Sequence, residues 1–152
     1  MKTTAHKSML ALAVSLAIAG PALAAGDENE VLIIQSSAAG VAEGNSATVA
    51  QTGTLNVALI GQQGELNTSI ISQNGEWHEA SAESVGQGNQ ISIEQQDDWH
   101  IAQVAVEGDN NQANSAQAGL FNQADVGITG NNNQVELRQT GEENEATAQL
   151  AG

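Results

Sequence analysis

A strict eleven-residue period, running from Asn45 to the last residue, constrains the fold of this 152-residue chain more than any other feature. The first position of the ten units is Asn in eight and His in two, and the ninth position is Gly in nine. No insertion or deletion interrupts this register. Such a period is typical of repeat architectures, in which each unit packs against its neighbours.

The seventh position shows that the true repeat is twenty-two residues long. Alternate units always carry Gln there, whereas the intervening units carry a mixed set. The invariant set is Gln51, Gln73, Gln95, Gln117 and Gln139, and the mixed set is Gln62, Ser84, Val106, Ile128 and Leu150. Two different strands therefore make one repeat, and the repeats are residues 45–66, 67–88, 89–110, 111–132 and 133–152.

Within each unit the side chains alternate with a period of two, which indicates a strand with two distinct faces. The first, third, fifth and seventh positions hold no charged residue in any unit, and every acid of the repeats falls on an outward or turn position. Since a buried unpaired carboxylate is costly, the uncharged positions face inward. A helix would need a period of 3.6, which the sequence does not show.

These dimensions predict an all-β fold. A seven-residue strand spans about 23 Å, and four residues containing Gly would reverse the chain, so each repeat makes one strand-turn-strand rung. Rungs would stack about 4.8 Å apart by backbone hydrogen bonds. We therefore expect a β-solenoid of five 22-residue rungs with cross-β, amyloid-like stacking.

Stacking places equivalent side chains over one another, so inward amides would form hydrogen-bonded ladders. The expected ladder and assembly residues are Gln51, Asn56, Gln62, Asn67, Gln73, Asn89, Gln95, Asn111, Gln117, Asn122, Asn133, Gln139 and Asn144. The expected turn glycines are Gly53, Gly64, Gly75, Gly86, Gly108, Gly119, Gly130 and Gly141.

The N-terminus has the pattern of a secretory signal peptide over residues 1–24. Lys2 and Lys7 form a positive region, an apolar stretch follows from Met9, and Ala22-Leu23-Ala24 fits an A-x-A cleavage site. The apolar stretch is too short for a transmembrane helix, which needs roughly 20 residues. We therefore expect an exported chain that begins at Ala25.

Residues 25–152 are strongly acidic. They contain eighteen Asp and Glu and a single cation, Arg138, which leaves a net charge of -17. This charge repels nucleic acid and anionic lipid, so we expect no nucleic-acid partner. The chain has no Cys, so disulfides do not hold it together.

The spacing Q-x-G-x-x-N-x-A followed by Gln resembles the curlin repeat of curli fibres, and appears complete at Gln51, Gly53, Asn56, Ala58 and Gln62. The resemblance implies a structural subunit of extracellular functional amyloid fibres, or fimbriae, on a Gram-negative cell. Such subunits interact with periplasmic chaperones and leave the cell through an outer-membrane secretion pore. Their fibres contribute to adhesion to host matrix or surfaces and to biofilm formation. Implied partners are further copies of the chain and a nucleator or major curlin subunit. Five regular repeats favour the major subunit over the nucleator.

Residues 25–44 precede the strict register. Asn29, Val31, Ile33 and Gln35 fit one more strand of the type that begins at Asn45, but Asn29 lies sixteen residues before Asn45, not twenty-two. The segment is either a degenerate edge strand with a linker from Ser36 to Gly44 or, by its similarity in location, a secretion-targeting region.

Two columns invite further interpretation. His78 and His100 are twenty-two residues apart and should stack, either as a two-ligand metal site or, as we favour, as replacements for Asn in its ladder. Trp77, Trp99 and Phe121 should form an apolar column with Leu55 beside the turns. That column would stiffen the edge, or bind carbohydrate or dye.

The remaining alternatives are a monomeric β-solenoid surface adhesin and a β-helical carbohydrate enzyme. The enzyme would need clustered carboxylates on neighbouring rungs, whereas the acids here are scattered. We expect no catalytic residues, no metal ligands and no cofactor, and favour the fibre subunit.

Overall fold

The structure is a computed structural model that describes residues 9–15, 18–37 and 44–152. Its described part contains thirteen strands and no helix, so no helix there could cross a membrane. The strands are β1 (Met9–Ser15), β2 (Ile18–Ala25), β3 (Glu30–Ser36), β4 (Ser46–Thr54), β5 (Val57–Glu65), β6 (Thr68–Glu76), β7 (Glu79–Gln87), β8 (Gln90–Asp98), β9 (Ile101–Asp109), β10 (Gln112–Leu120), β11 (Gln123–Thr129), β12 (Gln134–Glu142) and β13 (Glu145–Ala151).

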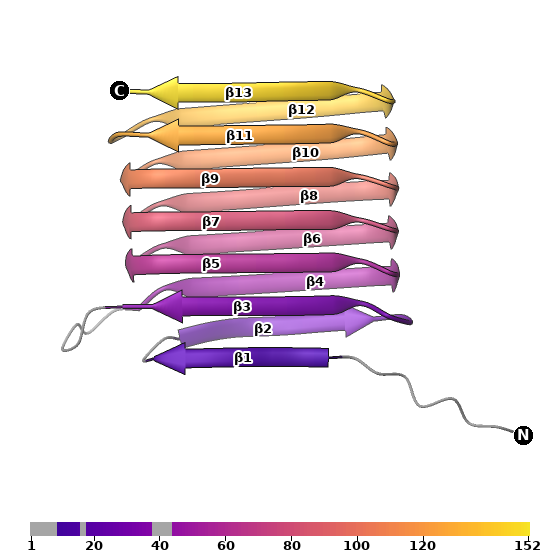
Figure 1. The fold of residues 1–152 in the computed structure, drawn as a ribbon, viewed down its shortest axis with the longest axis horizontal. Coiled ribbons are helices and arrows are strands. Elements are labelled where there is room, and N and C mark those ends of the chain that lie inside the picture. Colours follow the sequence, from indigo (N-terminus) through magenta and orange to yellow (C-terminus); the bar gives the residue numbers. More distant parts are fainter. Residues whose placement is uncertain (1–8, 16–17, 38–43) are drawn as a thin grey trace, which may run out of the picture.

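The strands form two parallel sheets that lie face to face (Figure 1). The odd-numbered strands make one sheet, in the order β1-β3-β5-β7-β9-β11-β13, and the even-numbered strands make the other. From β4 onward each strand pairs with its equivalent twenty-two residues later, as Gln112 does with Gln134 and Gln123 with Glu145. The predicted β-solenoid of about five turns is confirmed.

The core is the layer between the two sheets. The inward aliphatic side chains are buried almost completely, and Ile60, Ile71 and Ile93 are each 0% exposed. In the last repeat Val135, Ala146 and Ala148 are only partly buried. These residues lie in β12 and β13, the end strands of their sheets, with no described strand above them.

The turns differ from the prediction. Most strands from β4 onward are nine residues long, and two residues, such as Leu55 and Asn56, usually connect them. The first of these residues adopts the left-handed conformation, with φ 59 at Leu55 and 61 at Trp77. Seven of the eight predicted turn glycines instead lie near strand ends, and Gly130 follows β11.

The glycines are required both by their own positive φ, which is 106 at Gly53, and by the closeness of the next rung. A Cβ added to Gly53 would lie 2.0 Å from the carbonyl oxygen of Gly75, far inside contact distance. At Asp97, the one ninth position with a side chain, φ is 77 and the carboxylate accepts a 3.0 Å hydrogen bond from the Gly119 N–H. The one unit that has Asp in place of Gly thus gains a hydrogen bond between its carboxylate and the next rung.

The segment before the repeats forms a strand, but not the type that we predicted. β3 pairs with β5 in the odd sheet, Glu30 beside Val57, and so is equivalent to the strands that begin after Asn56. A strand that directly precedes β4 in the chain must lie in the opposite sheet. The distance from Asn29 to Asn45 should therefore be compared with the eleven-residue unit and not with the twenty-two-residue repeat. The offset from Glu30 to Val57 is twenty-seven residues, five more than the repeat.

β1 and most of β2 fall within the predicted signal peptide. β1 pairs with β3, and β2 pairs with β4 through a shifted register. The predicted cleavage after Ala24 remains a prediction, as do the repeat boundaries and the secretion-targeting role of residues 25–44. Residues 38–43 of the predicted linker lie outside the described part of the chain.

Candidate assembly interface

A ladder of Gln side chains runs through the even sheet. The amide nitrogen of Gln51 donates to the side-chain oxygen of Gln73 at 2.8 Å, and this bond repeats at 2.9, 3.0 and 2.9 Å through Gln95 and Gln117 to Gln139. Each Gln also donates to a backbone carbonyl, as Gln73 does to Val57 at 2.9 Å. The ladder therefore satisfies buried amides that would otherwise be costly to desolvate.

The Asn side chains fasten the ends of the rungs. The Oδ1 of Asn45 accepts the backbone N–H of Asn67 at 3.0 Å, and its Nδ2 donates to the Gly64 carbonyl at 2.9 Å. One amide thus binds two backbone groups of the neighbouring turn. The same pair of bonds recurs at Asn67, Asn89, Asn111 and Asn122.

At Asn56 the Oδ1 accepts the backbone N–H of His78, and the Nδ2 donates to Gly75. Asn133 and Asn144 lie in front of β12 and β13, where the described ladders end, and are only partly buried.

The seventh-position column of the odd sheet is not a continuous ladder. Gln62 accepts a hydrogen bond from Gln35 at 2.6 Å and donates to the Ser69 hydroxyl at 2.9 Å. The next residue in the column is Ser84, whose hydroxyl is buried without a hydrogen-bond partner in the described structure. Val106 and Ile128 then continue the column as apolar core.

His78 and His100 occupy the Asn column and take over one of its functions. Their rings stack with centroids 5.2 Å apart, and each Nδ1 accepts the backbone N–H of the next rung, at 3.3 Å for His78 and 3.2 Å for His100. Both side chains are buried. Burial lowers the pKa of His78 below its ordinary 6.5, and the neighbouring His100 lowers it further.

This geometry matches the predicted replacement of Asn by His. Both Nδ1 atoms already accept backbone hydrogen bonds, and the Nε2 of His100 lies 2.7 Å from the Gln96 carbonyl, which leaves the Nε2 of His78 as the one ring nitrogen of the pair without a partner among the described residues. In the described residues no group of three or more His, Cys, Asp and Glu could hold a metal ion.

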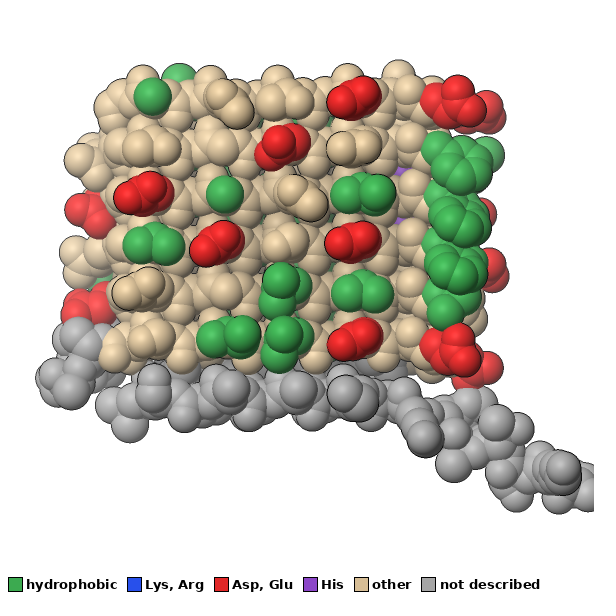
Figure 2. Space-filling view, in the orientation of Figure 1, with side chains coloured by type: hydrophobic (Ala, Val, Ile, Leu, Met, Phe, Trp, Pro, Cys, Tyr) green, Lys and Arg blue, Asp and Glu red, His purple; other side chains and the backbone are tan. Residues whose placement is uncertain are grey.

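The aromatic column lies along one edge of turns, where Figure 2 shows a continuous apolar ridge with acidic side chains at both ends. Trp77 and Trp99 stack with centroids 4.8 Å apart and planes 6° apart, and Phe121 continues the stack at 5.7 Å. Because each ring faces the next, the inner faces are not open to a sugar ring. The geometry favours a stiffening role for this column.

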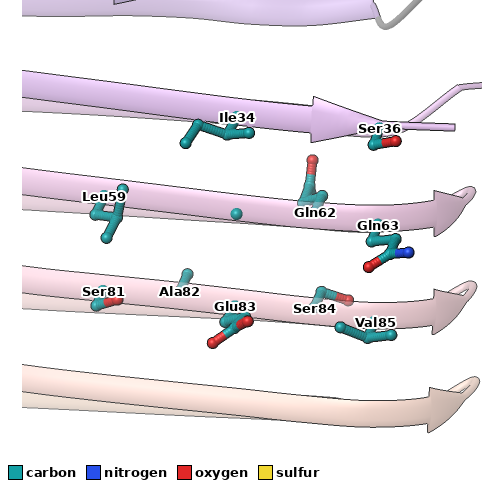
Figure 3. A pocket seen from close by; sticks show the side chains of 11 residues that line it. Ile34, Ser36, Leu59, Gln62, Gln63, Ser81, Ala82, Glu83, Ser84 and Val85 are labelled. Carbon is teal, nitrogen blue, oxygen red and sulfur yellow. The ribbon is translucent and has the colours of Figure 1, made fainter. Parts of the chain in front are cut away.

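A surface depression of about 380 Å³ lies on the odd sheet (Figure 3). It lies where Gly61 interrupts a column of outward side chains between Ile34 and Glu83. Among the described residues that line it, Glu83 is the single carboxylate, whereas glycoside hydrolysis commonly uses a pair. This hollow therefore gives no support to the carbohydrate-enzyme alternative.

The two ends of the Gln ladder are complementary. At the β4 edge, which β2 covers with Ala24 paired with Gln51, the side-chain oxygen of Gln51 is buried and has no hydrogen-bond partner among the described residues. At the β12 end, the Gln139 amide nitrogen donates to two backbone carbonyls of the described residues, Gln123 at 2.9 Å and Asn144 at 3.1 Å, and the bond to Asn144 takes the place of a link to a further Gln. One end therefore offers an acceptor and the other a donor, in the same column.

The pattern of these ladders is that of a known repeat. Residues 42–75 match the family model described as the curlin associated repeat. Residues 42–75 are similar to the curlin associated repeat. The matched range contains Gln51, Gly53, Asn56 and Gln62, and its twenty-two-residue register continues through β13. No curated protein and no solved structure matches the chain.

Sequence reasoning found the inward Gln and Asn residues but missed other groups at the interface. It did not identify Gln35 and Asn29, which bond to β5 and its preceding turn, as members of the ladders. It also missed the left-handed residues at the turns, because bulky side chains such as Trp77 are rare in that conformation.

Proposed function

We propose that this chain is a structural subunit of an extracellular curli-type amyloid fibre, which grows by stacking the β4 and β5 end of one copy on the β12 and β13 end of another. The curlin repeat and the β-solenoid fold fit such a subunit. The proposal includes export by the N-terminal signal and a role in adhesion and biofilm matrix at a Gram-negative cell surface.

The observation that carries the proposal is the complementarity of the Gln ladder. Every link within the subunit runs from the amide nitrogen of one Gln to the oxygen of the Gln twenty-two residues later. A second copy stacked in register would place its Gln51 oxygen over the Gln139 nitrogen and so continue the ladder. That contact would satisfy the Gln51 oxygen, which is buried without a hydrogen-bond partner among the described residues.

The backbone at the C-terminal end supports the same reading. β12 and β13 each have a neighbour on one side only, so their other edges carry unpaired N–H and C=O groups. An exposed, regular edge of this length is a template for a further strand. The columns of identical side chains make the added strand equivalent to an internal one.

The test is polymerisation of purified residues 25–152 at micromolar concentration. We expect fibres with a repeat of about 4.8 Å along the axis in diffraction, and thioflavin fluorescence that rises after a lag. A strand-rich monomer that stays soluble and does not bind the dye for days would support the monomeric adhesin instead.

We also propose that this chain is the major subunit and that it grows on a separate nucleator after passage through chaperones and a secretion pore. Its regular repeats support this role. A seeding assay separates the two subunit types. A major subunit polymerises slowly alone and quickly on a partner's fibres, whereas a nucleator accelerates the partner at trace amounts.

A further inference from the structure

The two sheets of the predicted mature chain contain unequal numbers of strands. Without β1 and β2, the odd sheet keeps six strands from β3 to β13, and the even sheet keeps five from β4 to β12. The extra strand is β3, which covers the edge of β5 while the edge of β4 is uncovered. A second copy must therefore stack on an uneven end.

With β3 in place, that end does not continue the solenoid. If β3 of the second copy paired with β13, then β4 of the second copy would lie two strand spacings from β12, or about 9.6 Å. One strand position in the even sheet would stay empty. The backbone groups of β12 and β4 would remain unpaired, and Gln139 could not reach Gln51 of the second copy.

Without β3 the joint closes. β4 of the second copy then pairs with β12, β5 pairs with β13, and both sheets continue in the register seen inside the subunit. We propose that β3 is a detachable edge strand which occupies, in the single subunit, the place that β13 of a neighbouring copy takes in the fibre. This inference rests on the proposed fibre function and specifies its interface.

The contacts of β3 show why it can hold that place. The Oδ1 of Asn29 accepts the backbone N–H of Asn56 at 2.9 Å, as Asn122 accepts that of Asn144 at 3.0 Å. The Asn29 Nδ2 donates to the Gly53 carbonyl at 2.9 Å, as Asn122 does to Gly141. β3 therefore uses the contacts of the repeats themselves.

Its inward side chains also match the edge of β5. With β1 paired beside them, Val31 and Ile33 are each 3% exposed, and Gln35 donates to the oxygen of Gln62. At the position of Gln35, β13 carries Leu150, which cannot donate that hydrogen bond. β3 is thus a strong competitor for β5, and its release would limit the rate of assembly.

The connection to β4 sets β3 apart from the other strands. Nine residues separate Ser36 from Ser46, where most neighbouring strands of the repeats are joined by two. The chain length thus allows β3 to move while β4 keeps its place in the stack. The two-residue turns that join most strands of the repeats keep each of these strands close to its neighbours in the chain.

The experiment compares the same substitution in two paired residues, Ile33 of β3 and Ile60 of β5. Ile33→Asp places a carboxylate in the core only while β3 is docked. Because burial of an unpaired charge is strongly unfavourable, the substitution should release β3. We expect a several-fold shorter lag in thioflavin assays of residues 25–152. Ile60→Asp, the matched control, should abolish fibre growth, since Ile60 is buried at 0% exposure in a strand that stays.

Amide hydrogen exchange of fibres made from the unsubstituted chain provides a measurement that needs no variant. We expect residues 30–36 to exchange quickly and residues 57–65 to be protected. Gln35→Ala, which removes only the bond to Gln62, should shorten the lag less than Ile33→Asp does.

Two results would overturn the inference alone. These are fibres in which residues 30–36 are as protected as residues 57–65, or an Ile33→Asp variant that is as slow as Ile60→Asp. Failure of the proposed function is a different outcome, because the unsubstituted chain would then form no fibres under any of these conditions.

Discussion

Gly141→Ala should produce a subunit that joins a fibre and then stops its growth. Inside the subunit, a Cβ on Gly119 would lie 2.1 Å from the Gly141 carbonyl oxygen, and a Cβ on Gly53 would lie 2.0 Å from that of Gly75. At Gly141 the nearest described atom is the Asn144 Nδ2, at 3.5 Å. An Ala at 141 therefore finds space in the single subunit but would overlap with Gly53 of the next copy.

The size of the effect follows from these distances. Real Cβ contacts stay above 3.0 Å, so the incoming β4 would have to move by about 1 Å and lose ladder bonds to β12. Each lost bond contributes about 1 kcal/mol net, and losing two weakens addition more than tenfold. Within the subunit, an Ala at φ +113 costs about 1–3 kcal/mol of strain, which does not depend on a neighbour.

Seeded elongation measures this. Gly141→Ala subunits retain their own β4 and β5 edge, so they should add to sonicated fibres of the unsubstituted chain and block that end at substoichiometric amounts. Gly119→Ala is the matched control. Its added Cβ would overlap with Gly141 of the same subunit and prevent β10 from stacking on β12, so this variant should not inhibit fibre growth. If Gly141→Ala elongates seeds at the normal rate and supports further growth, β12 does not receive β4 and the proposed joint is wrong.

The other predictions concern the ladders, the charge and the two ring columns. Gln139→Ala should lengthen the thioflavin lag because it removes the donor at the joint together with the acceptor of Gln117, whereas Gln134→Ala, at an outward and exposed position, should be close to neutral; equal delays would mean that the faces are assigned incorrectly. The pKa of His78 is lower in the folded chain than its ordinary 6.5, so the unfolded chain binds more protons as pH falls below about 6.5 and fibres should lose stability there. His78→Asn should remove that loss in guanidinium dissociation curves compared at each pH, and an unchanged pH dependence would contradict it. Trp99→Ala should lower the dissociation midpoint by removing two stacked pairs worth about 0.5–1.5 kcal/mol each, and no shift would show the column to be unimportant for stability. Added salt should shorten the lag, since it screens the acidic excess over about 8 Å, and a salt-independent lag would mean that the charges lie too far apart to interact.

The sequence predicted the faces and stacking of the repeats because every inward position repeats and excludes charge. It predicted the wrong sheet for β3 because Asn29 was compared with the twenty-two-residue period, although adjacent strands in the chain alternate between sheets. It placed the glycines in the turns because Gly usually marks them. In the structure these glycines combine a positive φ with a carbonyl one rung away, as between Gly53 and Gly75, and the sequence pattern alone does not show that second contact.

The direction of the hydrogen bonds explains why such a subunit would form open fibres and not closed dimers. Each Gln amide nitrogen donates toward the C-terminal end, while the Asn133 N–H, like its equivalents, donates back to the preceding rung. Two copies that met through the same end would set Gln139 donor against Gln139 donor, with their strands reversed. Only a head-to-tail contact pairs the Gln139 donor with the Gln51 acceptor. A heterologous contact of this kind adds a translation at every step and does not close, so the complementarity that permits one addition permits the next.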